Sequence, residues 1–190
     1  MRDLNQKLKR WGLGILAGSI LLSSSVSSFA QSPADPKKVL RYVFPVAETG
    51  FDPAGVHDLY SAHVNSSIFE TLFTYDYLAT PAKLVPRTAA ALPEVSADGL
   101  TYTIRLQKGI YFAADPVFKG KKRELTSADY VYTFKRLLDP SLRSPNSWLL
   151  DGRILGMDTL LKQAQKTGKF NYDQSVAGLQ TPDRYTLVIR

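Results

Sequence analysis

Apolar and polar residues alternate in three stretches of the chain, and this period of two is typical of β-strands. The stretches are residues 39–46, 100–106 and 184–190. A Lys-Gly turn follows the second stretch and leads into residues 110–112, which we expect to begin the return strand of a hairpin. The pattern therefore predicts strands near the start, in the middle and at the end of the sequence.

Apolar residues recur every three or four positions in three other stretches, which predicts amphipathic helices packed on a core. These stretches are 61–73, 126–139 and 157–166. The second begins with Thr126 and has Asp129 three positions later, which is a capping-box signature, and an Asp-Pro pair ends it. Helices and strands alternate irregularly without a repeat, so the predicted fold class is α/β in the sense of a mixed α+β lobe.

The last predicted strand ends at Arg190, with neither a turn nor a partner strand after it. A strand of this kind needs a neighbour to satisfy its backbone hydrogen bonds. We therefore expect the chain to be the front part of a larger protein, with an unpaired strand edge near Arg190 and an exposed face that another part covers. By itself such a front part is expected to be poorly soluble or to bind a ligand far more weakly than the complete protein.

The first thirty residues have the pattern of a secretory signal peptide. A head with four basic side chains precedes an apolar run at 11–22, which is shorter than the roughly 20 residues that span a bilayer. Small residues at Ser28 and Ala30 place the cleavage after Ala30, and an uncleaved anchor is the alternative. No cysteine follows the run, which argues against a lipoprotein. The sequence predicts an exported, periplasmic protein.

Cleavage lowers the net charge from +7 to +4, because residues 1–30 carry a net charge of +3. A net charge of this size is ordinary for a soluble exported domain and does not by itself indicate a nucleic-acid partner. The sequence has no cysteine, which excludes disulfides and thiolate metal sites.

Candidate catalytic and metal-binding chemistry is sparse. His57 and His63 are the only histidines, and on a helix their spacing turns them about 240° apart, so they would share a metal only if loops brought them together. His57, Asp58 and Ser61 suggest a hydrolase constellation, but no nucleophile elbow accompanies them. We therefore expect no catalytic residue, no metal ligand and no cofactor.

Two further segments have both an ordinary and a functional interpretation. The basic run at 119–123 lies between a strand and a helix cap, so we interpret it as a solvated loop and expect no nucleic-acid partner for an exported protein. Trp148 follows a loop-like Ser-Pro-Asn-Ser stretch, where an aromatic ring could be a ligand platform or a core side chain.

Several blocks of the sequence, in order and with similar spacing, resemble the extracellular solute-binding proteins of family 5, which are the peptide-binding components of ABC importers. The resemblance covers essentially all of 39–190. The blocks are 51–53, 68–72, 98–106, 108–112, 125–132, 135–140, 144–145 and 178–189. The segment 113–124 departs from the family, because it is long and basic where members usually have a short turn. This departure is consistent with a subgroup of the family and weakens any inference about the solute.

The resemblance implies the first-lobe portion of a two-lobed periplasmic-binding-protein clamshell, type II-like and truncated. Residues 31–60 would begin lobe one, and residues 61–190 would form its extra subdomain, incomplete at the C-terminus. Closure of the lobes would trap a peptide or a related small solute and exclude water, before docking on the permease subunits of the importer in the membrane. The acidic residue that holds the peptide's amino group would lie outside this sequence.

The resemblance also places the loop after the Asp-Pro pair at 52–53 beside the ligand cleft. We expect His57, Asp58, Leu59 and Tyr60 to contact the ligand there, together with Trp148. The alternative for each is an ordinary loop or packing residue. Other functions left open are a receptor of the same family for a metal chelate, haem or an opine, an exported hydrolase, and a fragment without function.

Overall fold

The structure, a computed structural model, describes residues 38–39 and 41–190 and divides into two units, 1–43 and 44–190. The predicted signal peptide and its cleavage after Ala30 lie outside the described residues, as does Leu40. All elements described below belong to the second unit. The predicted division of the mature chain at residue 60 stays a prediction.

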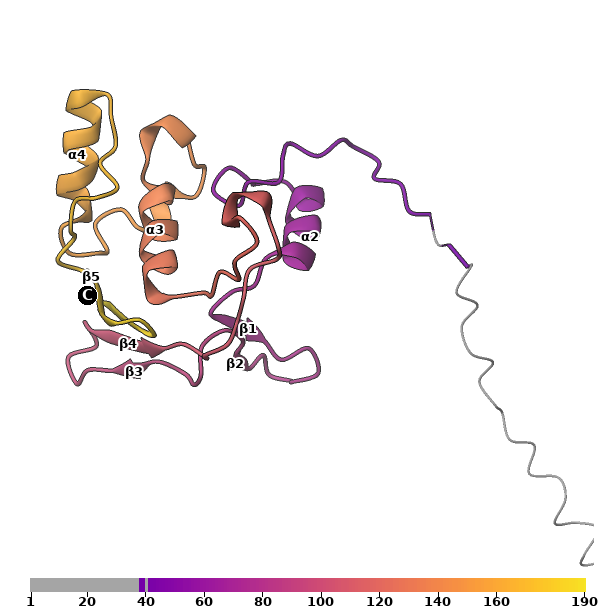
Figure 1. Ribbon diagram of the computed structural model, residues 1–190, viewed down its shortest axis with the longest axis horizontal. Coiled ribbons are helices and arrows are strands. Elements are labelled where there is room, and N and C mark those ends of the chain that lie inside the picture. Colours follow the sequence, from indigo (N-terminus) through magenta and orange to yellow (C-terminus); the bar gives the residue numbers. More distant parts are fainter. Residues whose placement is uncertain (1–37, 40) are drawn as a thin grey trace, which may run out of the picture. The chain divides into compact units, whose positions relative to one another are not determined.

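An antiparallel sheet of four strands forms one layer of the second unit (Figure 1). Its order is β3-β4-β6-β5, in which β3 is Glu94–Val95, β4 is Tyr102–Arg105, β6 is Thr186–Ile189 and β5 is Leu179–Asp183. The two central strands, β4 and β6, confirm the strands predicted at 100–106 and 184–190. Together with the helices below, the sheet confirms the predicted mixed α+β fold.

The prediction of an unpaired strand edge near Arg190 is wrong. Strand β6 pairs with β4 on one side and with β5 on the other, and its Leu187 and Val188 are both buried. Beyond the strand, the Arg190 N–H donates to the Gly178 carbonyl at 2.9 Å. The alternation in 184–190 predicted a half-buried strand but could not show which strands pair with it. The partners are β4, which is distant in sequence, and β5, which directly precedes β6.

The predicted hairpin between β4 and residues 110–112 is also wrong. Strand β6 occupies the edge of β4 that a return strand would need. Residues 110–112 pair instead with 123–125: Tyr111 forms an isolated bridge with Glu124, and the Leu125 N–H donates to the Ile110 carbonyl at 2.8 Å. This pairing closes the neck of the long basic segment.

Two helices confirm the predictions for the second half of the chain: α3 is Ser127–Leu137 and α4 is Met157–Thr167. Helix α3 starts where the capping box predicts, because one carboxylate oxygen of Asp129 accepts from the Thr126 N–H at 2.7 Å and from its hydroxyl at 2.9 Å. An apolar cluster joins α3 and α4 to the start of β5. Its buried members are Leu138, Leu150, Ile154, Met157, Leu160, Ala164, Phe170, Val176 and Leu179.

A buried lysine ties α3 to the loop after α4. The Lys135 Nζ donates to the carbonyls of Tyr172 and Gln174, both at 2.7 Å. Burial lowers the pKa of Lys135. The Tyr172 hydroxyl in turn donates to Asp139, just past the end of α3, at 2.6 Å. These hydrogen bonds hold the loop at 170–176 against α3, in addition to the apolar packing of its Phe170 and Val176.

The helix predicted at 61–73 is shorter in the structure and begins earlier. Helix α2 is Leu59–Ile68, and Phe73 belongs to β1 (Phe73–Tyr75), which pairs with β2 (Leu84–Pro86). The helix is not packed on a core as predicted: its buried residue is Ser61, and Ile68 is 61% exposed. The spacing of apolar residues indicates that a helix has an apolar face, but it does not indicate which part of the protein packs on that face.

The strand predicted at 39–46 is not formed at the residues that the structure describes there. Neither described sheet includes this segment. Alternation gives an extended chain an apolar face, but a strand also needs a neighbouring backbone to pair with. Within the described part of the chain, no helix is long and apolar enough to cross a membrane.

Candidate ligand-binding site

The loop that leads into α2 is shaped by hydrogen bonds to its own aspartates. One carboxylate oxygen of Asp58 accepts from the Ser61 N–H at 2.8 Å and so caps the helix, while the other accepts from the Thr49 hydroxyl. Hydrogen bonds from Ser61 and Thr49 hold the pKa of Asp58 well below its usual range. Asp58 is therefore a charged capping residue with both oxygens in use.

An ion pair fastens this loop to α3. Arg136 donates to the two carboxylate oxygens of Asp52 at 3.0 Å and 2.6 Å. The paired fork geometry fixes direction as well as distance. The hydrogen bond from Arg136 lowers the pKa of Asp52, so the pair stays charged at neutral pH.

A third contact brings the two predicted ligand-binding segments together. The side-chain amide of Asn146 donates to the Val56 carbonyl at 3.1 Å. Asn146 directly precedes η3 (Ser147–Leu149), the short helix that carries Trp148. The loop of His57 and the loop of Trp148 thus lie next to each other, although 90 residues separate the bonded pair in sequence.

The five predicted residues differ in how their side chains are used. His57 is exposed, and the side chains of Leu59 and Trp148 are 61% and 62% exposed. Tyr60 is half-buried, with its ring 5.2 Å from that of Phe44. The arrangement therefore leaves an imidazole, an aliphatic side chain and an indole free on the surface, held by a backbone that is fixed at three points.

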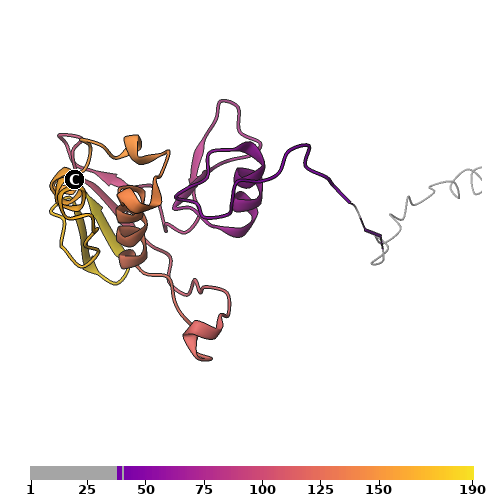
Figure 2. The ribbon, with the colours of Figure 1, turned by 90° about the horizontal axis from the view of Figure 1, so that it is seen from above.

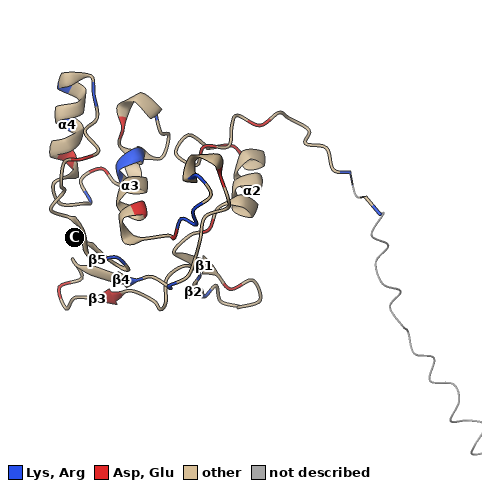
Figure 3. Cartoon of the chain, viewed as in Figure 1, with Lys and Arg blue, Asp and Glu red and all other residues tan. Residues whose placement is uncertain are grey.

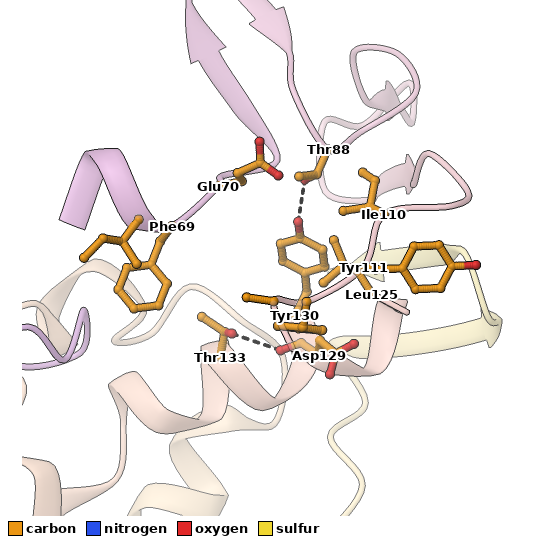
Figure 4. Close-up of a pocket in the computed structure, with 12 residues that line it drawn as sticks. Phe69, Glu70, Thr88, Ile110, Tyr111, Leu125, Asp129, Tyr130 and Thr133 are labelled. Atoms are coloured by element: carbon orange, nitrogen blue, oxygen red, sulfur yellow. Dashed lines mark hydrogen bonds between the residues drawn. The ribbon is translucent and has the colours of Figure 1, made fainter. Parts of the chain in front are cut away.

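A separate pocket of about 260 Å³ lies between the end of α2 and the first turns of α3 (Figure 4). Figure 4 shows Tyr130 reaching Thr88, and Thr88 donates onward to the Thr71 carbonyl at 3.0 Å. Burial raises the pKa of Tyr130, so its hydroxyl stays protonated and can act as a donor. The pocket combines these hydroxyls with aromatic rings, including Phe69.

None of the predicted binding residues lines this pocket. Its two carboxylates already have partners: Glu70 lies 3.4 Å from Arg87, and Asp129 pairs with Arg123. No pattern in the sequence indicated this pocket, since its lining comes from segments spread over residues 68–133 and each residue has an ordinary local role. Asp129, for example, indicated only a helix cap.

The structure contains no metal centre among the residues it describes: no group of three or more His, Asp or Glu side chains there could hold an ion. The His57 Nδ1 lies 3.5 Å from the Gly55 carbonyl oxygen. The chemistry available at the joined loops is therefore apolar contact, aromatic stacking and hydrogen bonding from one imidazole.

Comparison with known proteins gives a consistent set of relatives. A family model described as bacterial extracellular solute-binding proteins, family 5 (middle), matches residues 83–190. Di/tripeptide-binding protein 2 of Pseudomonas aeruginosa is 33% identical over 132 residues, which are 64% of this chain and 22% of that protein. Haem-binding protein A of Haemophilus influenzae is 31% identical over 130 residues, 67% of this chain and 23% of that protein.

Among solved structures, the chain resembles the oligopeptide-binding protein OppA of Haemophilus influenzae in complex with the peptide RPPGFSPFR. The TM-score is 0.57 at 25% sequence identity, and the match covers 75% of this chain and 24% of OppA. The chain thus spans about a quarter of the length of the relatives it matches. Its fold corresponds to part of a two-lobed peptide-binding protein. The chain belongs to the bacterial extracellular solute-binding proteins of family 5.

Proposed function

We propose that this chain belongs to the solute-binding component of an ABC importer, which captures peptides outside the cytoplasmic membrane and delivers them to a membrane permease. The observation that carries the proposal is the junction of the loops at 52–60 and 146–149, where Asn146 binds the Val56 carbonyl. In a family of solute receptors, two loops joined in this way and presenting free side chains suit the wall of a ligand cleft.

Peptide is the solute that this surface fits best. Leu59 and Trp148 offer apolar and aromatic area, and His57 offers a hydrogen bond without a fixed charge partner. Such a wall tolerates varied side chains, while the peptide's backbone would supply the common hydrogen bonds. The relative named as a di/tripeptide-binding protein supports this choice.

Titration calorimetry of the mature, full-length protein with a library of di-, tri- and longer peptides tests the proposal. The variant Trp148→Ala should weaken binding of the preferred peptide about tenfold or more, since a large aromatic contact at the centre of a binding site is worth of the order of 1–2 kcal/mol. Tyr77→Ala is the matched control, because Tyr77 is 97% exposed in the loop between β1 and β2. Unchanged peptide affinity in Trp148→Ala would show that the loop of Trp148 does not contact the ligand.

A non-peptide solute is the second candidate, and haem is the case that an observation favours. The relative named as haem-binding protein A shares 31% identity with this chain. An absorbance titration with haemin, run beside the peptide titration, separates the two. A saturable Soret shift with no heat from any peptide would favour haem, and His57→Ala would then show whether this histidine contributes.

We infer that the protein acts as a receptor rather than an enzyme. The relatives described above are named for what they bind. An assay of the mature protein against generic ester and peptide substrates tests the inference, and turnover would favour the alternative of an exported hydrolase.

We also propose that the protein is exported and that its signal peptide is cleaved after Ala30. Sequencing the N-terminus of the secreted protein should then give Gln31 as the first residue.

A further inference from the structure

The basic loop, defined here as residues 113–122, extends away from α3 and the sheet (Figure 2). Its neck is closed by the pairing of residues 110–112 with 123–125. The Phe112 N–H donates to the Arg123 carbonyl at 2.9 Å, and the Arg123 guanidinium lies 4.8 Å from the Phe112 ring centre. The loop is therefore a projection with a fixed base.

The tip of the basic loop is itself ordered by hydrogen bonds. Asp115 caps η1 (Pro116–Phe118) by accepting from the Val117 N–H at 2.8 Å, and the Lys121 N–H donates to the Phe118 carbonyl at 2.9 Å. The Phe118 ring lies 6.5 Å from that of Phe112 in the neck. This order presents Val117 outward, with 72% of it exposed.

The charges on the basic loop are not balanced by the carboxylates around it. Lys119, Lys121 and Lys122 are exposed, and within the described part of the chain none of them forms an ion pair. Figure 3 marks the lysines and arginines of the chain in blue and its carboxylate residues in red. The nearby carboxylates are occupied elsewhere. Asp115 caps η1, Asp129 pairs with Arg123, and Glu124 binds Arg184 at 3.1 Å.

A hollow of about 380 Å³ lies between the basic loop and β5–β6, and four of its lining side chains are cationic. These are Lys121, Lys122, Arg123 and Arg184, and they share the lining with one carboxylate, that of Glu124. A phosphate group entering this hollow would meet the ammonium groups of Lys121 and Lys122, which form no ion pair in the described part of the chain, although Lys122 lies 5.7 Å from the Tyr111 ring centre. The two guanidinium groups beside them are already paired with Asp129 and Glu124. An exposed apolar tip flanked by free lysines is the pattern of a segment that rests on an anionic lipid surface.

We propose that the basic loop is a membrane-docking element, which places Val117 among the headgroups of anionic phospholipids and binds their phosphates through Lys119, Lys121 and Lys122. The proposal goes beyond solute capture and does not depend on which solute is bound. Docking of this kind would keep the receptor near the membrane surface, where it would search for its permease in two dimensions rather than three.

Sedimentation of the mature, full-length protein with vesicles tests the proposal. Vesicles of phosphatidylglycerol and phosphatidylcholine in equal parts should bind the protein, and pure phosphatidylcholine should not. Binding should weaken as ionic strength rises from about 0.15 M to about 1 M, because the Debye length falls from about 8 Å to about 3 Å. Excess inorganic phosphate should not displace the protein, since a single free anion lacks the multiple contacts of a surface.

The variant Lys119→Gln/Lys121→Gln/Lys122→Gln should lose about a hundredfold in vesicle affinity, given that each lysine near an anionic surface is worth about fivefold and the three factors multiply. The matched control is Lys162→Gln/Lys166→Gln/Lys169→Gln, which removes the same charge from exposed positions in and after α4. Val117→Ser changes no charge and should cost about threefold by removing apolar area.

Three results would overturn the proposal. They are wild-type binding that does not distinguish the two vesicle compositions, equal losses in the loop variant and its control, and full displacement by inorganic phosphate. Peptide affinity measured on the same samples shows that the variants are folded. Loss of vesicle binding with peptide affinity intact would separate this proposal from the proposed function.

Discussion

The cluster that joins α3 and α4 to β5 contains side chains that are almost completely buried, whereas the segment from Phe44 to Ile68 buries only Ala54 and Ser61. Met157 and Leu160 in the cluster are 0% and 1% exposed. In the other region, Leu59 is exposed to the extent of 61%. The two regions belong to the same unit of the chain but are held by different interactions.

Apolar burial stabilises the α3–α4 region, at about 25 cal/mol for each Å² removed from water. The α2 region depends instead on the Asp58 cap, the Asp52–Arg136 ion pair and the Asn146–Val56 hydrogen bond. The last two are each worth of the order of 1 kcal/mol. The proposed ligand-binding loops are therefore placed by a few polar contacts on a close-packed apolar base. The loops can therefore shift without loss of the base.

The largest expected effect is in the apolar base. Leu160→Ala should lower the free energy of unfolding by about 2–5 kcal/mol, because the cavity left in a close-packed cluster cannot fully collapse. Native-state hydrogen exchange of α4 amides measures it. Leu59→Ala is the control, expected within about 0.5 kcal/mol of the wild type. An equal decrease in the free energy of unfolding in the two variants would contradict the proposed difference between the regions.

A glycine pair gives the next largest contrast. A Cβ at Gly178 would stand 2.6 Å from the Leu155 nitrogen and 2.7 Å from the Arg190 oxygen, both of them backbone atoms. Gly178→Ala should therefore cost about 1–3 kcal/mol, as overpacking does. At Gly55 the same Cβ meets its nearest atom at 3.8 Å, so Gly55→Ala should be tolerated. Faster exchange of the Leu155 and Arg190 amides in the first variant alone would confirm the contrast.

A smaller and more local effect is expected at the ion pair between the regions. Arg136→Lys keeps the charge but loses the two-point contact with Asp52, which should cost about 1 kcal/mol. The change should appear as faster exchange in the loop at 52–61, with α4 unaffected. Arg87→Lys serves as the control, because Arg87 reaches Glu70 through one contact at 3.4 Å. Spread of the effect into α4 would show that the loop and the base unfold together.

The smallest effect is a pH dependence of the same pair. The pKa of Asp52 is lowered from 3.8, chiefly by the hydrogen bond from Arg136, so its contribution to stability is complete above about pH 4. That contribution is lost as the pH falls through the lower folded-state pKa. Asp52→Asn should thus differ from the wild type in loop exchange at pH 6, and the difference should shrink toward pH 2. A difference in loop exchange that stays the same from pH 6 to pH 2 would show that packing, and not the charge of Asp52, causes the effect.

Local signals in the sequence were sufficient for α3, α4 and β4, whereas β5 was not predicted. The Thr126 cap with Asp129 gave the start of α3, the Asp-Pro pair at 139–140 gave its end, and apolar spacing gave α4 and β4. Each signal works within one or two turns or a single strand, where sequence neighbours are also spatial neighbours. The ligand-binding residues were predicted by resemblance, and their role stays a prediction.

The sequence by itself determined that α3 and α4 are helices and that β4 and β6 are strands, and it contains the blocks by which the chain resembles family 5. Only the tertiary structure decided that β6 is a central strand, that α2 leaves its apolar side chains exposed, and that Asn146 lies against Val56. The reason is physical. Periodicity specifies which face of an element is apolar, but the backbone and side chains that meet this face come from residues far along the chain, and the free energy of the whole arrangement selects them.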